Sequence, residues 1–181
     1  WDTAQAGDFD AYVKTVSAPQ VTELITHYHP AVLWWDINGP FTPAQARLLT
    51  ASFGQDPALI YNNRMGGGVP GDTETPEQTI PANGFPGKDW ETCMTINDTW
   101  GYKEHDQQWA EPAEVIALLS ACTARNANLL LNVGPRADGT LPEPAIARLS
   151  KVGRWMNQHG SAIHGGSAPD LEWQPPWGEL V

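Results

Sequence analysis

The chain has 181 residues, 41% hydrophobic and 17% charged, which is the composition of a folded globular protein. Its formal net charge of −11 at pH 7 argues against nucleic acid and anionic membrane surfaces as partners. No apolar run approaches the roughly 20 residues that cross a bilayer, and the amino end lacks the basic and apolar segments of a secretion signal. We therefore expect a soluble chain with a single domain over residues 1–181, and its cellular location stays open.

Helix-like and strand-like segments alternate in the amino-terminal part of the chain. Residues 18–29 predict a helix with Pro19 in its first turn, and its apolar face consists of Val21, Leu24, Ile25 and Tyr28. Residues 31–36 predict a buried strand, and residues 57–64 predict a second one. Between them, Thr42 and Pro43 predict the cap and first residue of a helix that reaches Phe53.

The alternation continues after a long loop rich in glycine, proline and threonine. Residues 91–97 predict a third strand, and residues 111–126 predict a helix whose inward side chains are Val115, Ile116, Leu119 and Cys122. Residues 128–135 form a nearly continuous apolar run, which is typical of a strand covered on both faces. A last helix over residues 143–159 stops at Gly160, and the side chains predicted to face the core are Ile146, Leu149 and Trp155.

Helices that alternate with apolar strands indicate an α/β fold with about four parallel strands. In such folds, functional side chains gather at the carboxyl ends of the strands and in the loops that follow. Asp36 and Arg64 end the first two predicted strands, residues 97–100 follow the third, and Asn132 ends the fourth. We therefore expect these polar residues on one rim, although a strand-end aspartate can also cap a helix or form a turn.

Metal and phosphate sites find no support in the sequence. Cys93 and Cys122 lie in apolar patterns without metal-site spacing, which favours buried thiols over a disulfide. Residues 64–72 are glycine-rich but lack the lysine and the serine or threonine of a P-loop. His27 and His29 fit surface or capping roles near a helix end.

Tryptophan is the outlier of the composition. The chain has nine tryptophans and four tyrosines, and several lie beside polar or charged residues. Sugar rings present apolar C–H faces and hydroxyl edges, so a site built for them uses flat indole surfaces with carboxylates and arginine nearby. For any single tryptophan, packing in a hydrophobic core is the favoured interpretation, and only several beside carboxylates make a pattern.

Six ordered motifs, taken together, are far more specific than any one of them. They are VLWWD (32–36), NNR (62–64), GDTETPEQ (71–78), WETCMTINDTWGY (90–102), NLLLNVGPRADGTL (128–141) and WMNQHGSAIHG (155–165). In order and spacing they resemble the α-L-fucosidases of glycoside hydrolase family 29. This resemblance implies a retaining exo-α-L-fucosidase, which releases terminal α-L-fucose from glycosides and oligosaccharides by double displacement on a (β/α)8-like barrel.

The resemblance also implies roles for individual residues. Asp36 falls on the position of the nucleophile, and Glu77 of the TPE segment aligns best with the acid/base, with Glu74 of the same loop held in reserve. Arg64 and the indoles of Trp34 and Trp100 match positions that contact the sugar. The competing interpretations are solvated loop carboxylates, a surface salt bridge and core packing. Glu91 is interpreted as a structural partner of backbone or of an arginine, and no metal or other cofactor is implied.

Family members also carry an amino-terminal half of the barrel, which this sequence lacks. We therefore expect a partial barrel of about four strands with flanking helices, the carboxyl-terminal half of a fucosidase catalytic barrel. An open sheet leaves unpaired edges and an apolar face, so we expect a homo-oligomer that completes the open half-barrel, or a missing segment of a parent chain in its place. The alternative function is a fucose-binding half-barrel, or an inactive one, without turnover.

Overall fold

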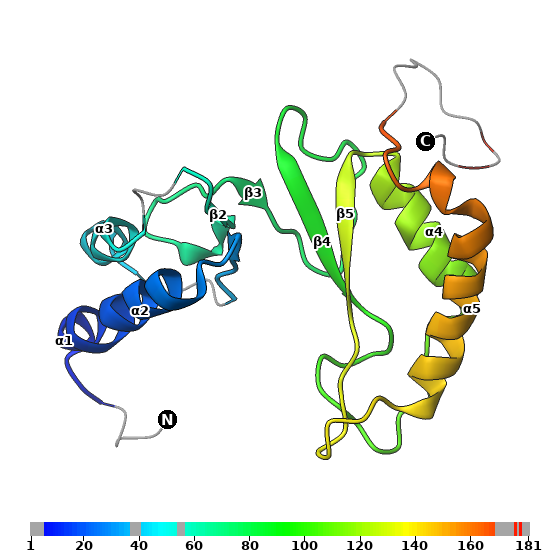
Figure 1. The fold of residues 1–181 in the computed structure, drawn as a ribbon, viewed down its shortest axis with the longest axis horizontal. Helices are drawn as coiled ribbons and strands as arrows, with labels where there is room; N and C mark the ends of the chain where they lie inside the picture. Colours follow the sequence, from blue (N-terminus) through cyan, green and yellow to red (C-terminus); the bar gives the residue numbers. More distant parts are fainter. Residues whose placement is uncertain (1–5, 37–40, 54–56, 169–175, 177, 179–181) are drawn as a thin grey trace. The chain divides into compact units, whose positions relative to one another are not determined.

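The computed structural model describes residues 6–36, 41–53, 57–168, 176 and 178, and divides the chain into two compact units, Trp1–Glu74 and Thr75–Val181 (Figure 1). Each unit contains a pair of parallel strands with helices beside them, which confirms the α/β class with parallel strands. None of the described helices combines the length and apolarity that a bilayer-crossing segment requires.

A continuous helical segment opens the first unit. It consists of α1 (Phe9–Tyr12), a π-helical turn (Val13–Ser17) and α2 (Ala18–Tyr28), and the side chain of Asp8 caps its start by accepting the Ala11 N–H at 3.0 Å. The helix predicted over residues 18–29 corresponds to α2, which continues without a break from the helical turns before it. Pro19 has no N–H to donate and its ring crowds the preceding turn, and the widened π turn, in which the Ala18 N–H reaches the carbonyl of Val13, accommodates it.

The apolar face of α2 is narrower than predicted. Val21 is buried and Ile25 packs against the core of the unit, but Leu24 and Tyr28 are 47% and 75% exposed. The helix contacts its unit through a thin stripe that starts at Val13 and Ala18, so the two outer side chains of the predicted face stay in solvent. His29 ends the helix in a left-handed conformation and His27 is exposed, as expected of a capping and a surface residue.

The two strands of the first unit are short. β1 (Val32–Leu33) and β2 (Ile60–Tyr61) pair in parallel, with Val32 opposite Ile60 and Leu33 opposite Tyr61, and β3 (Thr73–Glu74) follows them. Longer strands were predicted over residues 31–36 and 57–64. The regular ladder stops because the next backbone groups of the first strand bond to a side chain, as described below.

Helix α3 (Pro43–Ala51) begins where the sequence predicts. The Thr42 hydroxyl accepts the Gln45 N–H at 3.3 Å, and the Gln45 side chain accepts the Thr42 N–H at 2.7 Å, which forms a capping box. The helix packs into the core of the first unit, whose buried side chains are Val13, Ala18, Val21, Ala46, Leu49, Phe53, Leu59 and Met65.

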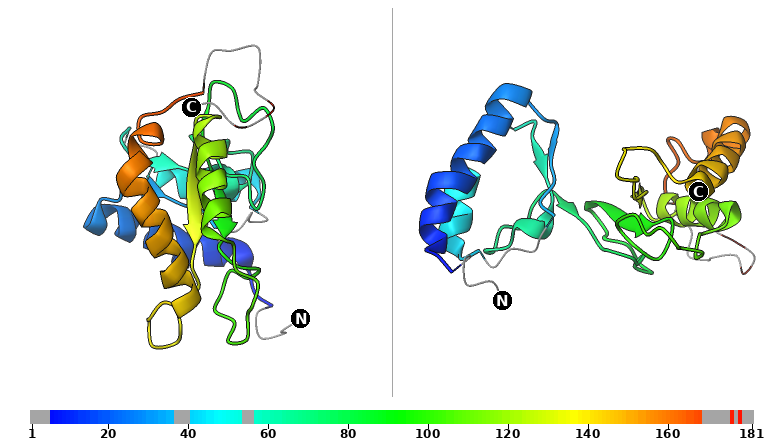
Figure 2. Two further views of the ribbon diagram at one scale, coloured as in Figure 1. Left: turned by 90° about the vertical axis from the view of Figure 1, so that its right-hand side faces the viewer. Right: turned by 90° about the horizontal axis from the view of Figure 1, so that it is seen from below.

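In the second unit, β4 (Asp89–Thr95) pairs in parallel with β5 (Ala127–Asn132) over six residues, from Trp90 opposite Ala127 to Thr95 opposite Asn132. Helices α4 (Pro112–Thr123) and α5 (Glu143–His159) pack against each other, and α4 packs against β5 (Figures 1 and 2). The predicted span of α5 is confirmed. The core between helices and strands contains Ile96, Val115 and Val152, with Ile116, Leu119, Leu131 and Leu149 packed around it.

Two burial predictions in this unit are wrong. Leu130 is 43% exposed while its neighbours Leu129 and Leu131 are half-buried, so β5 is covered on one face and not on both. The helices lie on that one side of the strand pair. Ile146 is 40% exposed, and Trp155 is half-buried against the ring of His159, 5.2 Å away between centroids, so that Leu149 alone of the three predicted α5 residues packs in the core cluster.

Cys93 in β4 and Cys122 in α4 are buried and form no disulfide, as the sequence predicts. Burial raises the pKa of Cys122 to about 11, because the thiolate would lose its hydration.

We expect neither thiol of the folded chain to react with Ellman's reagent within minutes at about pH 8, and both to react after unfolding in guanidinium. Cys122→Ala should lower the number of reactive thiols per chain by one in guanidinium and leave the folded protein unreactive. Rapid reaction of a thiol in the folded chain would contradict this.

Candidate active site

The buried side chain of Asn62 joins the ends of β1 and β2. Its Oδ1 accepts the backbone N–H of Trp35 at 2.9 Å, and its Nδ2 donates to the backbone carbonyl of Trp35 at 2.8 Å. Asn62 has no exposed surface. One amide side chain therefore replaces the next rung of the strand ladder and fixes the backbone between Trp34 and Asp36.

Arg64 lies in the helical turn that follows β2 and is 7% exposed. Its guanidinium carbon is 4.7 Å from the centroid of the Trp34 ring, which is a cation–π contact, and its Nη1 donates to the backbone carbonyl of Asp36 at 3.4 Å. The structure thus brings Trp34, Asp36 and Arg64 together at the carboxyl ends of β1 and β2. Asp36 itself is exposed at this position.

The same strand ends hold a carboxylate from further along the chain. Glu74 in β3 accepts a hydrogen bond from the Asn63 side chain at 2.6 Å. Its approach depends on Gly71, where φ is +69° and an added Cβ would lie 2.5 Å from the backbone carbonyl of Asn62. Only glycine permits this close passage, so the loop that carries Glu74 is fixed against the site.

Glu77 belongs to the second unit, in a segment that runs beside the middle of β4. It forms a parallel bridge with Cys93, flanked by hydrogen bonds from Gln78 N–H to the Cys93 carbonyl and from Cys93 N–H to the Pro76 carbonyl. The Glu77 side chain is exposed. Glu91 lies within β4, opposite Asn128, at a half-buried position.

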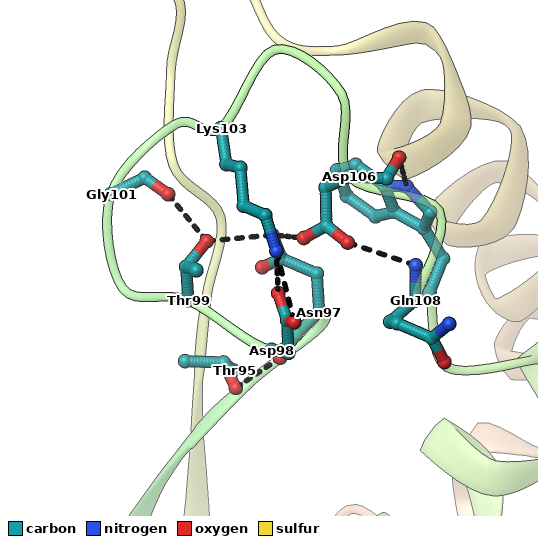
Figure 3. Close-up of polar contacts among 9 residues, drawn as sticks. Thr95, Asn97, Asp98, Thr99, Gly101, Lys103, Asp106 and Gln108 are labelled. Atoms are coloured by element: carbon teal, nitrogen blue, oxygen red, sulfur yellow. Dashed lines mark hydrogen bonds and ion pairs between the residues drawn. The ribbon is translucent and has the colours of Figure 1, made fainter.

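The loop after β4 is organised by a buried carboxylate, Asp106 (Figure 3). Its Oδ1 accepts the Gln108 N–H at 2.8 Å, and its Oδ2 accepts the side-chain amide of Asn97 at 2.6 Å. These two hydrogen bonds, the backbone one first, hold the pKa of Asp106 below its usual range. The backbone carbonyl of Asp106 also accepts the indole N–H of Trp109, so both ends of the loop are tied to one residue.

The tip of this loop carries Trp100 and Tyr102, each 41% exposed. Gly134, from the loop after β5, packs directly under it, because an added Cβ would lie 2.6 Å from the carbonyl carbon of Gly101 and from the nitrogen of Tyr102. The guanidinium carbon of Arg136 is 5.9 Å from the centroid of the Tyr102 ring. The loops after β4 and β5 therefore form one joined rim in the second unit.

The predicted residues fall into these two groups. Trp34, Asp36 and Arg64 form one cluster in the first unit, and Glu74 is tied to the neighbouring Asn63; Glu77 and Trp100 belong to the second unit. Within the part of the chain that the structure describes, no three His, Cys, Asp or Glu side chains are grouped as a metal would require.

Sequence reasoning missed Asn62, Asp106, Tyr102 and Arg136. Asn62 could have been found from its place in the NNR motif, since a buried side-chain amide at a strand end needs hydrogen-bond partners. Tyr102 and Arg136 come from two loops that only the folded chain brings together, whereas Asp106 bonds to Asn97, Gln108 and Trp109 of its own loop.

Comparison with known proteins identifies the family. The family profile described as alpha-L-fucosidase matches residues 1–161. The chain belongs to the α-L-fucosidase family. A putative α-L-fucosidase of Caenorhabditis elegans is 34% identical over 169 residues, which cover 85% of this chain and 34% of that protein. The chain thus spans about a third of the length of this curated relative.

Solved structures of the family agree with this assignment. The α-L-fucosidase isoenzyme 1 of Paenibacillus thiaminolyticus superposes with a TM-score of 0.82 at 33% identity, covering 97% of this chain and 45% of that one. The α-fucosidase of Thermotoga maritima, solved with a mechanism-based inhibitor, has a TM-score of 0.73 at 30% identity and covers 87% of this chain and 36% of its own. The recognition of the family from six sequence motifs is therefore confirmed.

Asn62→Ala tests the strand-end junction. The substitution removes two hydrogen bonds and leaves the N–H and carbonyl of Trp35 without them in a buried place, so we expect the free energy of unfolding to fall by about 2–4 kcal/mol. Urea denaturation measures this. Asn157→Ala, at an exposed position of α5, is the matched control and should change stability by less than about 0.5 kcal/mol. Equal effects of the two changes would contradict the role of Asn62.

Proposed function

We propose that this chain acts as the carboxyl-terminal half of a fucosidase catalytic barrel, over residues 1–181, and carries out retaining exo-hydrolysis of terminal α-L-fucose. Family membership supports the reaction class. The observation that carries the proposal is the cluster at the ends of β1 and β2, where a buried guanidinium lies on the Trp34 indole and donates to the backbone of Asp36.

Asp36 is the proposed nucleophile. Its carboxylate attacks the anomeric carbon of fucose, the bond from that carbon to the leaving oxygen breaks, and a covalent glycosyl-enzyme forms. The Asn62 and Arg64 hydrogen bonds to the backbone of residues 35 and 36 support this role, because they fix the main chain from which the carboxylate projects.

Glu77 is the proposed acid/base, with Glu74 as the alternative. The carboxylic acid protonates the departing glycosidic oxygen; as a carboxylate it then takes a proton from the water that attacks the anomeric carbon and releases Asp36. The exposure of Glu77 is compatible with contact to a leaving group. The hydrogen bond from Asn63, next to Arg64, supports Glu74.

Substrate binding is assigned to Trp34, Arg64 and Trp100. A guanidinium donates paired hydrogen bonds to sugar hydroxyls, and the indoles cover the apolar faces of the ring and its methyl group. The substrates are fucosylated glycans or aryl fucosides. Two carboxylates complete the reaction without a metal or another cofactor.

Turnover of 4-nitrophenyl α-L-fucoside by the full 181-residue chain tests the mechanism. Asp36→Asn should lower kcat/KM at least about 10³-fold, because no covalent intermediate can form. Of Glu77→Gln and Glu74→Gln, only the acid/base variant should lose activity on a fucosyl disaccharide by about 10²–10⁴-fold. On the aryl substrate this variant should recover activity when azide is added, because the aryl leaving group departs with little protonation and the azide anion then attacks the glycosyl-enzyme without a general base, which gives fucosyl azide.

Two further measurements distinguish retaining hydrolysis from fucose binding without turnover. The proton NMR spectrum of the first product should show the α anomer of fucose if configuration is retained. A folded chain without turnover that still binds L-fucose in a calorimetric titration, and loses binding in Arg64→Met, would replace hydrolysis by the binding function. Neither turnover nor binding would contradict both.

We further propose that copies of the chain associate through their open strand faces. The support is exposed apolar surface on both strand pairs: the paired residues Val32 and Ile60 are 49% and 47% exposed, and Leu130 is 43% exposed. Strand faces of this kind are usually covered in a soluble protein.

The mass in solution tests association. Sedimentation equilibrium at micromolar concentration should give a mass of at least twice the 19.7 kDa of one chain. Leu130→Lys should shift the mass to that of one chain, whereas Leu48→Lys, at a 39% exposed position of α3, should leave it unchanged. A single-chain mass for the unmodified protein would contradict self-association and favour a separate segment that covers the same faces.

A further inference from the structure

The tip of the loop after β4, which carries Trp100, has no backbone pairing of its own. Among the described residues, residues 99–102 neither donate a hydrogen bond to another backbone group nor accept one from it. The indole of Trp100 is 41% exposed, so burial in a core does not fix it either. Side chains therefore have to hold the backbone on both sides of this ring.

A chain of side-chain hydrogen bonds supplies that support (Figure 3). Asn97 Nδ2 donates to Asp106 Oδ2 at 2.6 Å and to the hydroxyl oxygen of Thr99 at 3.0 Å. The Thr99 hydroxyl in turn donates to the Gly101 carbonyl at 2.8 Å. Because Thr99 and Gly101 are the two sequence neighbours of Trp100, the chain closes across it.

The carboxylate at the start of this chain determines the direction of every later hydrogen bond. An ionised carboxylate only accepts, so Asp106 requires the amide nitrogen of Asn97, and not the amide oxygen, on its side. The Thr99 hydroxyl accepts the second hydrogen of that nitrogen, which leaves its own hydrogen for the Gly101 carbonyl. The direction has a cost: Asn97 Oδ1 is buried, and none of the described residues donates to it.

The chain depends on Asp106 being ionised. The residue is 5% exposed, and burial alone would raise its pKa. The hydrogen bond from the Gln108 N–H is the largest influence and the one from Asn97 adds to it, so the pKa of Asp106 lies below its usual range. The neighbouring carboxylate of Asp98 forms an ion pair with Lys103 at 3.1 Å. Asp106 is therefore a carboxylate at neutral pH.

We propose that Asp106 is a positioning residue for Trp100 and acts through the hydrogen bonds of Asn97. The inference rests on the proposed function for its ligand, the fucose ring that Trp100 is assigned to cover. The position of the indole is measured without any ligand, so the two can be tested separately.

An amide in place of the carboxylate reverses the chain. In Asp106→Asn the side-chain oxygen can still accept the Gln108 N–H, but the new NH2 group faces Asn97, whose amide then turns its oxygen inward. The Thr99 hydroxyl donates to that oxygen and no longer to the Gly101 carbonyl. The buried groups keep their hydrogen bonds, while the backbone around Trp100 loses its link.

The measurement is the indole N–H signal of Trp100 in the ¹⁵N-labelled full chain, assigned by its loss in Trp100→Phe. We expect Asp106→Asn and Thr99→Val each to shift this signal, and the double variant to shift it no further, because both break the same link. Thr99→Ser keeps the hydroxyl and should match the parent chain. Asp138 likewise accepts a backbone N–H and a hydroxyl, so Asp138→Asn is the matched control and should leave the signal in place.

Binding and turnover show the effect on the proposed reaction. In a calorimetric titration with L-fucose, Asp106→Asn and Thr99→Val should bind about three- to tenfold more weakly, the equivalent of one lost hydrogen bond. With 4-nitrophenyl α-L-fucoside the loss should appear in KM, and kcat should stay within about twofold, because Trp100 covers the sugar and takes no part in bond breaking.

The same spectra give the opposite outcome. A Trp100 signal that stays in place in both Asp106→Asn and Thr99→Val, or that Asp138→Asn shifts equally, would overturn the positioning role. If Asp106→Asn does not fold, Thr99→Val and Thr99→Ser decide the question alone. Absence of L-fucose binding by the parent chain, with the indole signal shifted as expected in the variants, counts against the proposed function and not against the role of Asp106.

Discussion

The two hydrogen bonds between the Asn62 side chain and the backbone of Trp35 are the constraint on which the first unit depends. They end the short ladder of β1 and β2 and replace it with a junction that no backbone pairing could provide. With the main chain fixed there, Trp34 and Asp36 are placed on either side of residue 35, and Arg64 reaches both from the turn after β2. The cluster of Trp34, Asp36 and Arg64 thus depends on one buried amide.

In the second unit a buried carboxylate fixes the backbone after a strand, as Asn62 does in the first. Asp106 gathers the loop after β4 by accepting from Asn97 and from the backbone of Gln108, so the loop does not need secondary structure of its own. Gly134 then joins this loop to the one after β5 by direct backbone contact. In both units a polar side chain at a strand end fixes backbone beside aromatic residues, which are half-buried in the first unit and 41% exposed at Trp100 and Tyr102 in the second.

Prediction from the sequence succeeded where the determining interaction is local. The cap at Thr42, the start of α3 at Pro43 and the span of α5 depend on nearby residues, and all three are as predicted. Prediction failed where residues distant in the sequence or an unusual backbone turn determine the structure. The helical turns before Ala18 were not predicted, and Leu130, predicted to be covered, is exposed because helices cover only one side of its strand. The order of the six motifs nevertheless identified the family, because recognition of a motif does not depend on correct helix bounds or burial.

The sequence by itself determined the α/β class, the buried thiols, the family, and the residues proposed for the chemistry, because these depend on residue type, local periodicity and order along the chain. Only the tertiary structure decided that Arg64 lies on Trp34, that Glu74 is tied to Asn63, and that Tyr102 meets Arg136. Each of these contacts joins segments separated by loops, and a linear pattern does not fix which loops meet. Their meeting is set by close backbone passages, such as those at Gly71 and Gly134, which exist only after the strands have paired.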